Sequence, residues 1–190
     1  MRKRFMILGI VVIILLFSGC AADNHVKTNT DNDIVTTQWD PDTFREMRNM
    51  NLTAVDSFVN TLSAIIEQKD TVSMERLFAP NLLTDCLTDD DIELLYSYVE
   101  GSVVSANRVS AHGSESKNEG EINAFIMISI DLETTVATYR IAVKASISDT
   151  LDDHNIGICS LYITKAENTD TQFAYWGDHE WLHGIVIENK

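Results

Sequence analysis

The chain has 190 residues, 45% of them apolar, and its 14 basic and 29 acidic residues give a formal net charge of −15. Such a surface repels nucleic acid and anionic lipid headgroups, so neither is an expected partner. The length and apolar content are enough for one domain with a sizeable core.

Residues 1–19 predict a secretory signal peptide. Arg2, Lys3 and Arg4 precede an uncharged apolar run over residues 5–17, the order typical of such signals. The run is shorter than the about 20 residues that a membrane-spanning helix needs. We therefore expect a signal peptide rather than a permanent anchor helix.

The small residues after the apolar run predict lipid attachment at Cys20. Residues 16–20, Leu-Phe-Ser-Gly-Cys, resemble the bacterial lipobox, whose cysteine receives a diacylglyceryl group and becomes the new N-terminus. Two or three acyl chains hold a protein stably on a membrane, so we expect the extracellular face of the cell membrane. Cleavage would leave 11 basic and 29 acidic residues, a net charge of −18. The alternative is an ordinary cleaved signal in which Cys20 is incidental.

Residues 20–38, rich in Asn, Asp and Thr, predict a flexible tether, and residues 39–190 predict a single domain. Asp40 and Pro41 are typical of a helix start. Apolar residues then recur at helical spacing as far as Ile66, which predicts one long helix.

Two shorter helices should follow the long one. Residues 71–78 supply two helical turns before Pro80 stops them. Thr88 and Asp91 have the spacing of a capping box, which predicts a third helix that ends at Gly101.

Beyond residue 102 the pattern changes to β-branched residues and alternation. It predicts strands over residues 103–111, 121–132, 136–148 and 156–166. Their connections are too short for helical crossovers, so we expect an antiparallel meander, curled around the long helix. The third strand should place its odd-numbered residues, Tyr139 to Ile147, in the core and Ser146 and its even-numbered neighbours in solvent. The predicted class is α+β.

Several segments resemble known families. Residues 70–81, which follow a long amphipathic helix, resemble the opening of proteins shaped like nuclear transport factor 2. Residues 98–105, 139–142, 157–163 and 175–177 are similar to a family of uncharacterised lipoproteins from Gram-positive bacteria, over residues 42–188. The resemblance implies a cone-shaped domain whose helices close over the concave face of a curled antiparallel sheet. It implies no activity.

The open end of such cones usually hosts ligands, which makes four aromatic side chains pocket candidates. They are Phe125, Tyr139, Tyr162 and Trp176. The alternative is that each of them simply fills the core.

Residues 179–183, His-Glu-Trp-Leu-His, match the H-E-x-x-H pattern of zinc peptidases. That chemistry needs a helix that brings His179 and His183 to one face beside Glu180. Gly177 and Gly184 bracket the motif, and the β-branched residues that follow are typical of a strand. We predict a loop that leads into a terminal strand, with no bound metal. A zinc-dependent hydrolase is the least favoured alternative.

Cys86 and Cys159 are the other two cysteines. They either form a disulfide, which an extracellular location permits, or remain free buried thiols. Cys159 should share an apolar strand face with Leu161 and Ile163.

Acid–base chemistry would need a His or Asp in the cone with a partner that sets its pKa. The candidates His112, Asp131 and His154 have no such partner at a fixed spacing. The sequence contains no Gly-rich phosphate loop and no G-x-S-x-G pattern, and we expect no cofactor.

These patterns favour a lipid-anchored binding or interaction protein, whose partner is a small molecule, a peptide or an envelope protein. An isomerase-like or dehydratase-like enzyme of the cone fold is the main alternative. A cavity that holds a buried His or Asp with a polar partner would favour the enzyme, whereas a cone filled by side chains would favour interaction through the outer surface.

Overall fold

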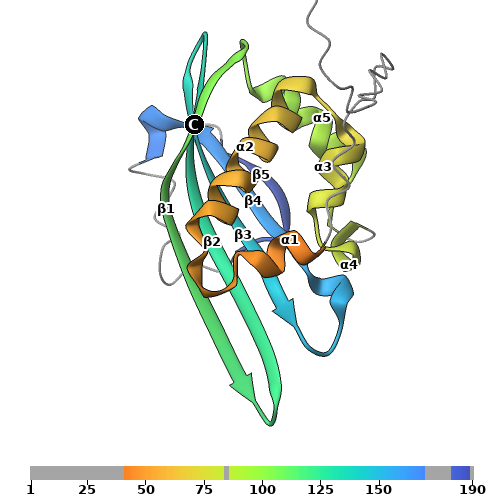
Figure 1. The fold of residues 1–190 in the computed structure, drawn as a ribbon. Helices are drawn as coiled ribbons and strands as arrows, with labels where there is room; N and C mark the ends of the chain where they lie inside the picture. Colours follow the sequence, from red (N-terminus) through yellow and green to blue (C-terminus); the bar gives the residue numbers. More distant parts are fainter. Residues whose placement is uncertain (1–40, 84–85, 170–180, 189–190) are drawn as a thin grey trace, which may run out of the picture. The chain divides into compact units, whose positions relative to one another are not determined.

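The computed structural model describes residues 41–83, 86–169 and 181–188. All of them belong to the second of the two compact units into which the chain divides, residues 35–190. Within these ranges the α-helices come first and the β-strands second (Figure 1). The fold is therefore α+β, as predicted.

The predicted long N-terminal helix is divided. Its parts are α1 (Pro41–Glu46), the 3₁₀ turn η1 (Arg48–Met50) and α2 (Leu52–Gln68). Asn49 and Met50 have left-handed φ angles of 61° and 59°, which a right-handed helix does not accommodate. Asn51 then caps α2, and its side chain accepts a hydrogen bond from Ala54 N at 3.4 Å. The prediction of one continuous helix was wrong. A helix that ends and begins again within a few residues keeps the spacing of its apolar residues, so the sequence pattern does not reveal the break.

Three further helices follow: α3 (Thr71–Leu77), α4 (Pro80–Leu83) and α5 (Asp89–Tyr98). The capping box predicted for α5 is confirmed, since Thr88 N donates to Asp91 Oδ2 at 2.9 Å and Asp91 N donates to Thr88 Oγ1 at 3.3 Å. α4 was not predicted. Pro80 ends the preceding segment and also starts α4, because the first helical position needs no N–H donor.

The sheet has the strand order β1-β2-β3-β4-β5, with β1 and β5 at its open edges. The strands are β1 (Val103–Asn118), β2 (Glu121–Thr134), β3 (Thr138–Asp149), β4 (Gly157–Lys165) and β5 (Gly184–Ile187). The first four form the predicted antiparallel meander. Short 3₁₀ turns, η2 (Asp153–Asn155) and η3 (Ala166–Asn168), precede and follow β4.

β5 departs from the meander because it runs parallel to β4. The strand expected over residues 185–187 is present, but its direction was not predicted. A parallel neighbour requires a long connection, and here the chain passes through residues 166–183 between the two strands.

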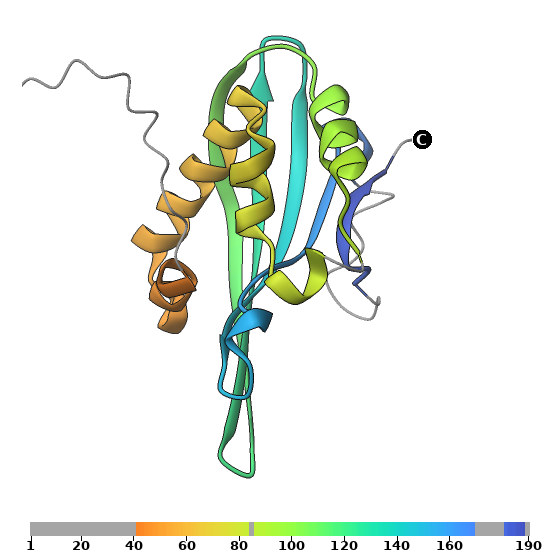
Figure 2. The same cartoon turned by 90° about the vertical axis from the view of Figure 1, so that its right-hand side faces the viewer.

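The helices lie on one face of the sheet (Figure 2). Buried side chains from both pack together in the layer between them. Phe58 of α2, Leu95 of α5 and Tyr139 of β3 are each fully buried there. On the opposite face of the sheet, Ser129, Ser146 and Ser160 are also no more than 2% exposed. The prediction that Ser146 is solvated was therefore wrong.

Two buried tyrosines allow a test of the core. Tyr139 Oη accepts a hydrogen bond from Glu100 N at 2.9 Å, whereas Tyr96 Oη is buried without a hydrogen-bond partner in the described part of the chain. Tyr96→Phe should leave the free energy of unfolding unchanged or raise it, while Tyr139→Phe should lower it by about 1 kcal/mol. Urea denaturation measures both. Equal destabilisation by the two changes would show that the Tyr96 hydroxyl is bonded.

Candidate ligand-binding site

Two different segments pair with the outer edge of β4. Phe78 forms a parallel bridge with Ile158, and Ala79 N donates to Ile158 O at 3.0 Å. β5 continues along the same edge from Gly184, which lies opposite Ser160. Beside this junction lies a cavity of about 200 Å³, here called the β4-edge cavity. It is lined by Ala79, Leu82, Asn123, Phe125, Ser146, Asp149, Asn155, Cys159 and His183.

Two glycines allow the close packing around the cavity. Gly157 has a φ of 139°, and a Cβ there would lie 2.6 Å from Ala79 N. Gly184 has a φ of 87°, and a Cβ there would collide with the carbonyl oxygen of Cys86. Any other residue at either position would combine a strained backbone with a steric clash.

Side chains of three neighbouring strands face the cavity. Phe125 of β2 pairs with Ser146 of β3, which pairs with Gly157 of β4. Cys159 is the extra residue in a register shift, because Lys144 pairs with Ser160 and the next β3 residue, Ala145, with Ile158. Such a bulge re-aims a side chain.

The bulge explains why one sequence prediction was wrong. Period-two alternation puts Cys159 on the same face as Leu161 and Ile163, which lie in the core. Cys159 instead joins Phe125 and Ser146 in the cavity lining. Burial raises the pKa of its thiol, and a hydrogen bond with the Ser146 backbone and the charge of Lys144 only partly oppose this effect. A thiol of this kind is a weak nucleophile at neutral pH.

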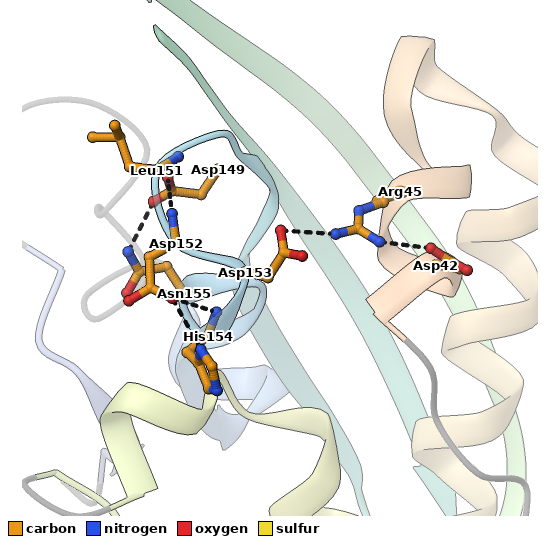
Figure 3. A network of polar contacts seen from close by, with 8 residues as sticks. All are labelled: Asp42, Arg45, Asp149, Leu151, Asp152, Asp153, His154 and Asn155. Carbon is orange, nitrogen blue, oxygen red and sulfur yellow. Dashed lines mark hydrogen bonds and ion pairs between the residues drawn. The ribbon is translucent and has the colours of Figure 1, made fainter.

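The end of β3 and the loop after it contribute Asp149 and Asn155 to the cavity lining; Figure 3 shows the hydrogen bonds within this loop. The Asp149 carboxylate accepts hydrogen bonds from Leu151 N, Asp152 N and Asn155 Nδ2 at 2.9, 3.2 and 2.8 Å. These donors lower the pKa of Asp149, the Asn155 amide most strongly. Asn81 of α4 donates to Asn155 Oδ1 at 2.8 Å and so ties the loop to α4.

A second contact holds this loop to the N-terminal helix. Arg45 of α1 bridges Asp42 and Asp153 at 2.7 and 2.9 Å (Figure 3). These two ion pairs are exposed and contribute little energy by themselves. The contact between Arg45 and Asp153 joins the loop to α1.

Among the residues that line the cavity, Ser146 has a buried side-chain oxygen that lacks a hydrogen bond. Its residue is 2% exposed, and Oγ has no partner within the ranges that the structure describes. A buried hydroxyl without a partner costs about 1–3 kcal/mol. Such a group is characteristic of a site that a ligand or water completes.

The four aromatic candidates do not come together. Phe125 lines the β4-edge cavity. Tyr139 lies in the core on the helix-facing side, with its ring against Tyr98. Tyr162 lies on the opposite face, where Trp181 packs edge-on with ring centroids 5.3 Å apart. Trp176 lies outside the described residues.

The H-E-x-x-H motif is described only in part. His179 and Glu180 lie outside the described residues, while His183 is exposed, is not in a helix and borders the β4-edge cavity. Within the described ranges, no cluster of three or more His, Cys, Asp or Glu side chains could hold a metal ion.

The acid–base candidates are dispersed. His112 on β1 and His154 in η2 are exposed. Asp131 on β2 binds Arg140, with Oδ1 2.5 Å from Nε. None of the three lines the β4-edge cavity.

The cysteines have different surroundings. Cys86 and Cys159 are free thiols, the first exposed and the second half-buried. Cys20 lies outside the described residues.

Sequence reasoning missed most of the cavity. Ser146, Asp149 and Asn155 were not candidates. The cluster Asp149-Thr150-Leu151-Asp152 is a turn signal. It predicts the loop that borders the cavity, but it does not predict the cavity.

A family model described as a domain of unknown function (DUF5104) matches residues 61–166. The chain belongs to the DUF5104 family. The matched DUF5104 region runs from α2 to the end of β4 and contains the whole cavity lining except His183. A search of curated proteins found no match to the chain. None of the helices in the described ranges is long and apolar enough to cross a membrane.

The loop after β3 predicts a dependence of stability on pH. Because the folded state lowers the pKa of Asp149, its contribution is present above the unfolded pKa of about 4 and is lost as pH falls through the folded value. Asp149→Asn should lower the free energy of unfolding by about 1–3 kcal/mol at pH 7, and the deficit should shrink towards pH 2. Denaturation at several pH values measures this. The exposed control Asp153→Asn should lose less than about 1 kcal/mol, and a deficit for Asp149→Asn that is independent of pH would contradict the assignment.

Proposed function

We propose that this protein is a lipid-anchored lipoprotein of the extracellular face of the cell membrane, and that it binds a ligand in the β4-edge cavity. The observation that carries the binding proposal is the buried, unpartnered Ser146 hydroxyl in a cavity with an apolar side of Ala79, Leu82 and Phe125. A mostly apolar hollow with a few polar groups is the usual form of a binding site. The signal pattern of residues 1–19 and the lipobox cysteine Cys20 support the location.

The cavity volume indicates the size of the ligand. About 200 Å³ is below the roughly 300–1,000 Å³ of sites for drug-sized molecules. A small molecule, or one side chain of a peptide or envelope protein, fits this volume.

Binding is better supported than acid–base catalysis. The centre of the layer between helices and sheet, where an enzyme of the cone fold would hold its substrate, is occupied by side chains such as Phe58 and Tyr139. A hollow of about 180 Å³ remains between η1 and the sheet, but the titratable side chains that line it, Arg48 and Glu115, form an ion pair with each other. The β4-edge cavity offers a thiol whose pKa is raised by burial, Cys159, and a carboxylate already bound by three donors, Asp149. Neither group is prepared to transfer a proton or attack a substrate. The third titratable side chain, His183, is exposed and has no partner among the described residues that would orient it.

The proposal extends to the fold family. We infer that the domain of residues 39–190 is related to the cone-shaped proteins resembling nuclear transport factor 2. Helices that precede an antiparallel sheet and pack on one of its faces support this relation. In this chain the ligand would bind at the β4 edge, between Leu82 of α4 and the sheet face that carries Phe125 and Ser146.

Lipid attachment is tested by Cys20→Ala. Metabolic labelling with a fatty acid should mark the wild-type protein, while the variant should stay unlabelled and appear in the medium or as uncleaved precursor. Equal labelling of the two proteins would refute anchoring through Cys20.

Ligand binding is tested by a fragment screen on the full-length lipoprotein in a neutral detergent. Anionic, neutral and cationic fragments are compared by saturation-transfer NMR, with Ser146→Val as the variant that fills the cavity and removes its hydroxyl. Fragments that occupy the β4-edge cavity should lose their signal in the variant. If every fragment behaves identically with both proteins, the cavity is not a binding site.

A further inference from the structure

Lys144 is the second unusual polar group near the cavity. It is half-buried on β3, two residues before Ser146 and on the same face of the sheet. Its Nζ lies 5.1 Å from the centroid of the Phe125 ring, and its charge acts on the Cys159 thiol. Lys144 is not itself one of the lining residues, but Phe125 and Cys159 both are, so its ammonium group lies close to two sides of the cavity.

The neighbouring cation on this face is neutralised, whereas Lys144 is not. Arg140, four residues earlier on β3, forms two hydrogen bonds to Asp131 at 2.5 and 3.2 Å. Lys144 forms no ion pair with any described residue. The chain has 29 acidic and 14 basic residues, so carboxylates outnumber the basic side chains that can pair with them. A half-buried ammonium group without a carboxylate partner therefore needs an explanation.

The two groups are chemically complementary to one kind of ligand. A hydroxyl donates one hydrogen bond and an ammonium group donates up to three, and charge-assisted bonds to an anionic oxygen are about twice as strong as neutral ones. The side chains of Ala79, Leu82 and Phe125 offer an apolar surface beside these donors. Asp149 also lines the cavity, but its charge is directed to three donors of its own loop.

We propose that the β4-edge cavity binds the carboxylate of a small organic acid, with Ser146 Oγ and Lys144 Nζ as donors and the apolar side against the rest of the molecule. This inference rests on the proposed binding function. The carboxylate can belong to a simple acid or to an amino acid.

The test uses full-length lipoprotein in a neutral detergent and five probes of similar size. They are propionate, alanine, propionamide, propylammonium and inorganic phosphate. Propionate should bind, as measured by saturation-transfer NMR titration, and propionamide, which has the same shape without the charge, should bind at least about tenfold more weakly. Tighter binding of alanine than of propionate would identify an amino acid as the source of the carboxylate.

Variants assign the donors. Lys144→Met and Ser146→Ala should each raise the Kd of propionate by about tenfold or more. Lys117→Met removes the same charge from an exposed site, and Ser160→Ala removes another buried, unpartnered hydroxyl that does not line the cavity. Both controls should leave the Kd within about twofold. Ser146→Ala should also raise the Tm of the ligand-free protein, because it removes an unsatisfied buried group.

The outcomes separate this inference from the binding function. The carboxylate assignment is overturned if neither propionate nor alanine binds in the cavity while propionamide, propylammonium or phosphate does. The binding function would then remain intact. Failure of every fragment to bind overturns both. Equal losses in Lys144→Met and Lys117→Met would show that only net charge matters and would also overturn the assignment.

Discussion

The pairing of Phe78 and Ala79 with the outer edge of β4 is the contact on which the arrangement of the site depends. It fixes the end of α3 and the start of α4 against the sheet through a backbone hydrogen bond of 3.0 Å. The approach is so close that only a glycine fits at residue 157. Because this segment occupies only the first part of the edge, β5 can pair with the remainder, and the cavity forms where the two meet.

Much of the fold follows from local sequence patterns. The capping box at Thr88, the strand alternation and the short connections of the meander are local signals, and the structure contains the elements that they predict. The break at Asn49 and the parallel direction of β5 did not follow from such signals. An Asn cap leaves the helical periodicity intact, and strand direction depends on the path of a long connection.

The site was less predictable than the fold, for a physical reason. A single bulge at Cys159 changes which side chains of β4 face the cavity, so alternation assigned this residue to the wrong face. Aromatic residues drew attention to Tyr139 and Tyr162, but the register places them on opposite faces of the sheet. Ser146 has a buried hydroxyl without a hydrogen-bond partner in the described structure, and Lys144 has an aromatic ring but no carboxylate beside its ammonium group there. Whether a side chain has a partner depends on residues that are distant in the sequence, so no local pattern reveals it.

The two segments on the outer edge of β4 differ in the length of chain that their pairing closes. β5 returns to β4 across residues 166–183, whereas Phe78 meets Ile158 across α4, α5 and the first three strands. Closing a longer loop carries a larger entropic cost, and non-local strand pairs form slowly. His183 directly precedes β5. The cavity is therefore bounded on both sides by non-local pairings, and it is complete only in a chain in which both have formed.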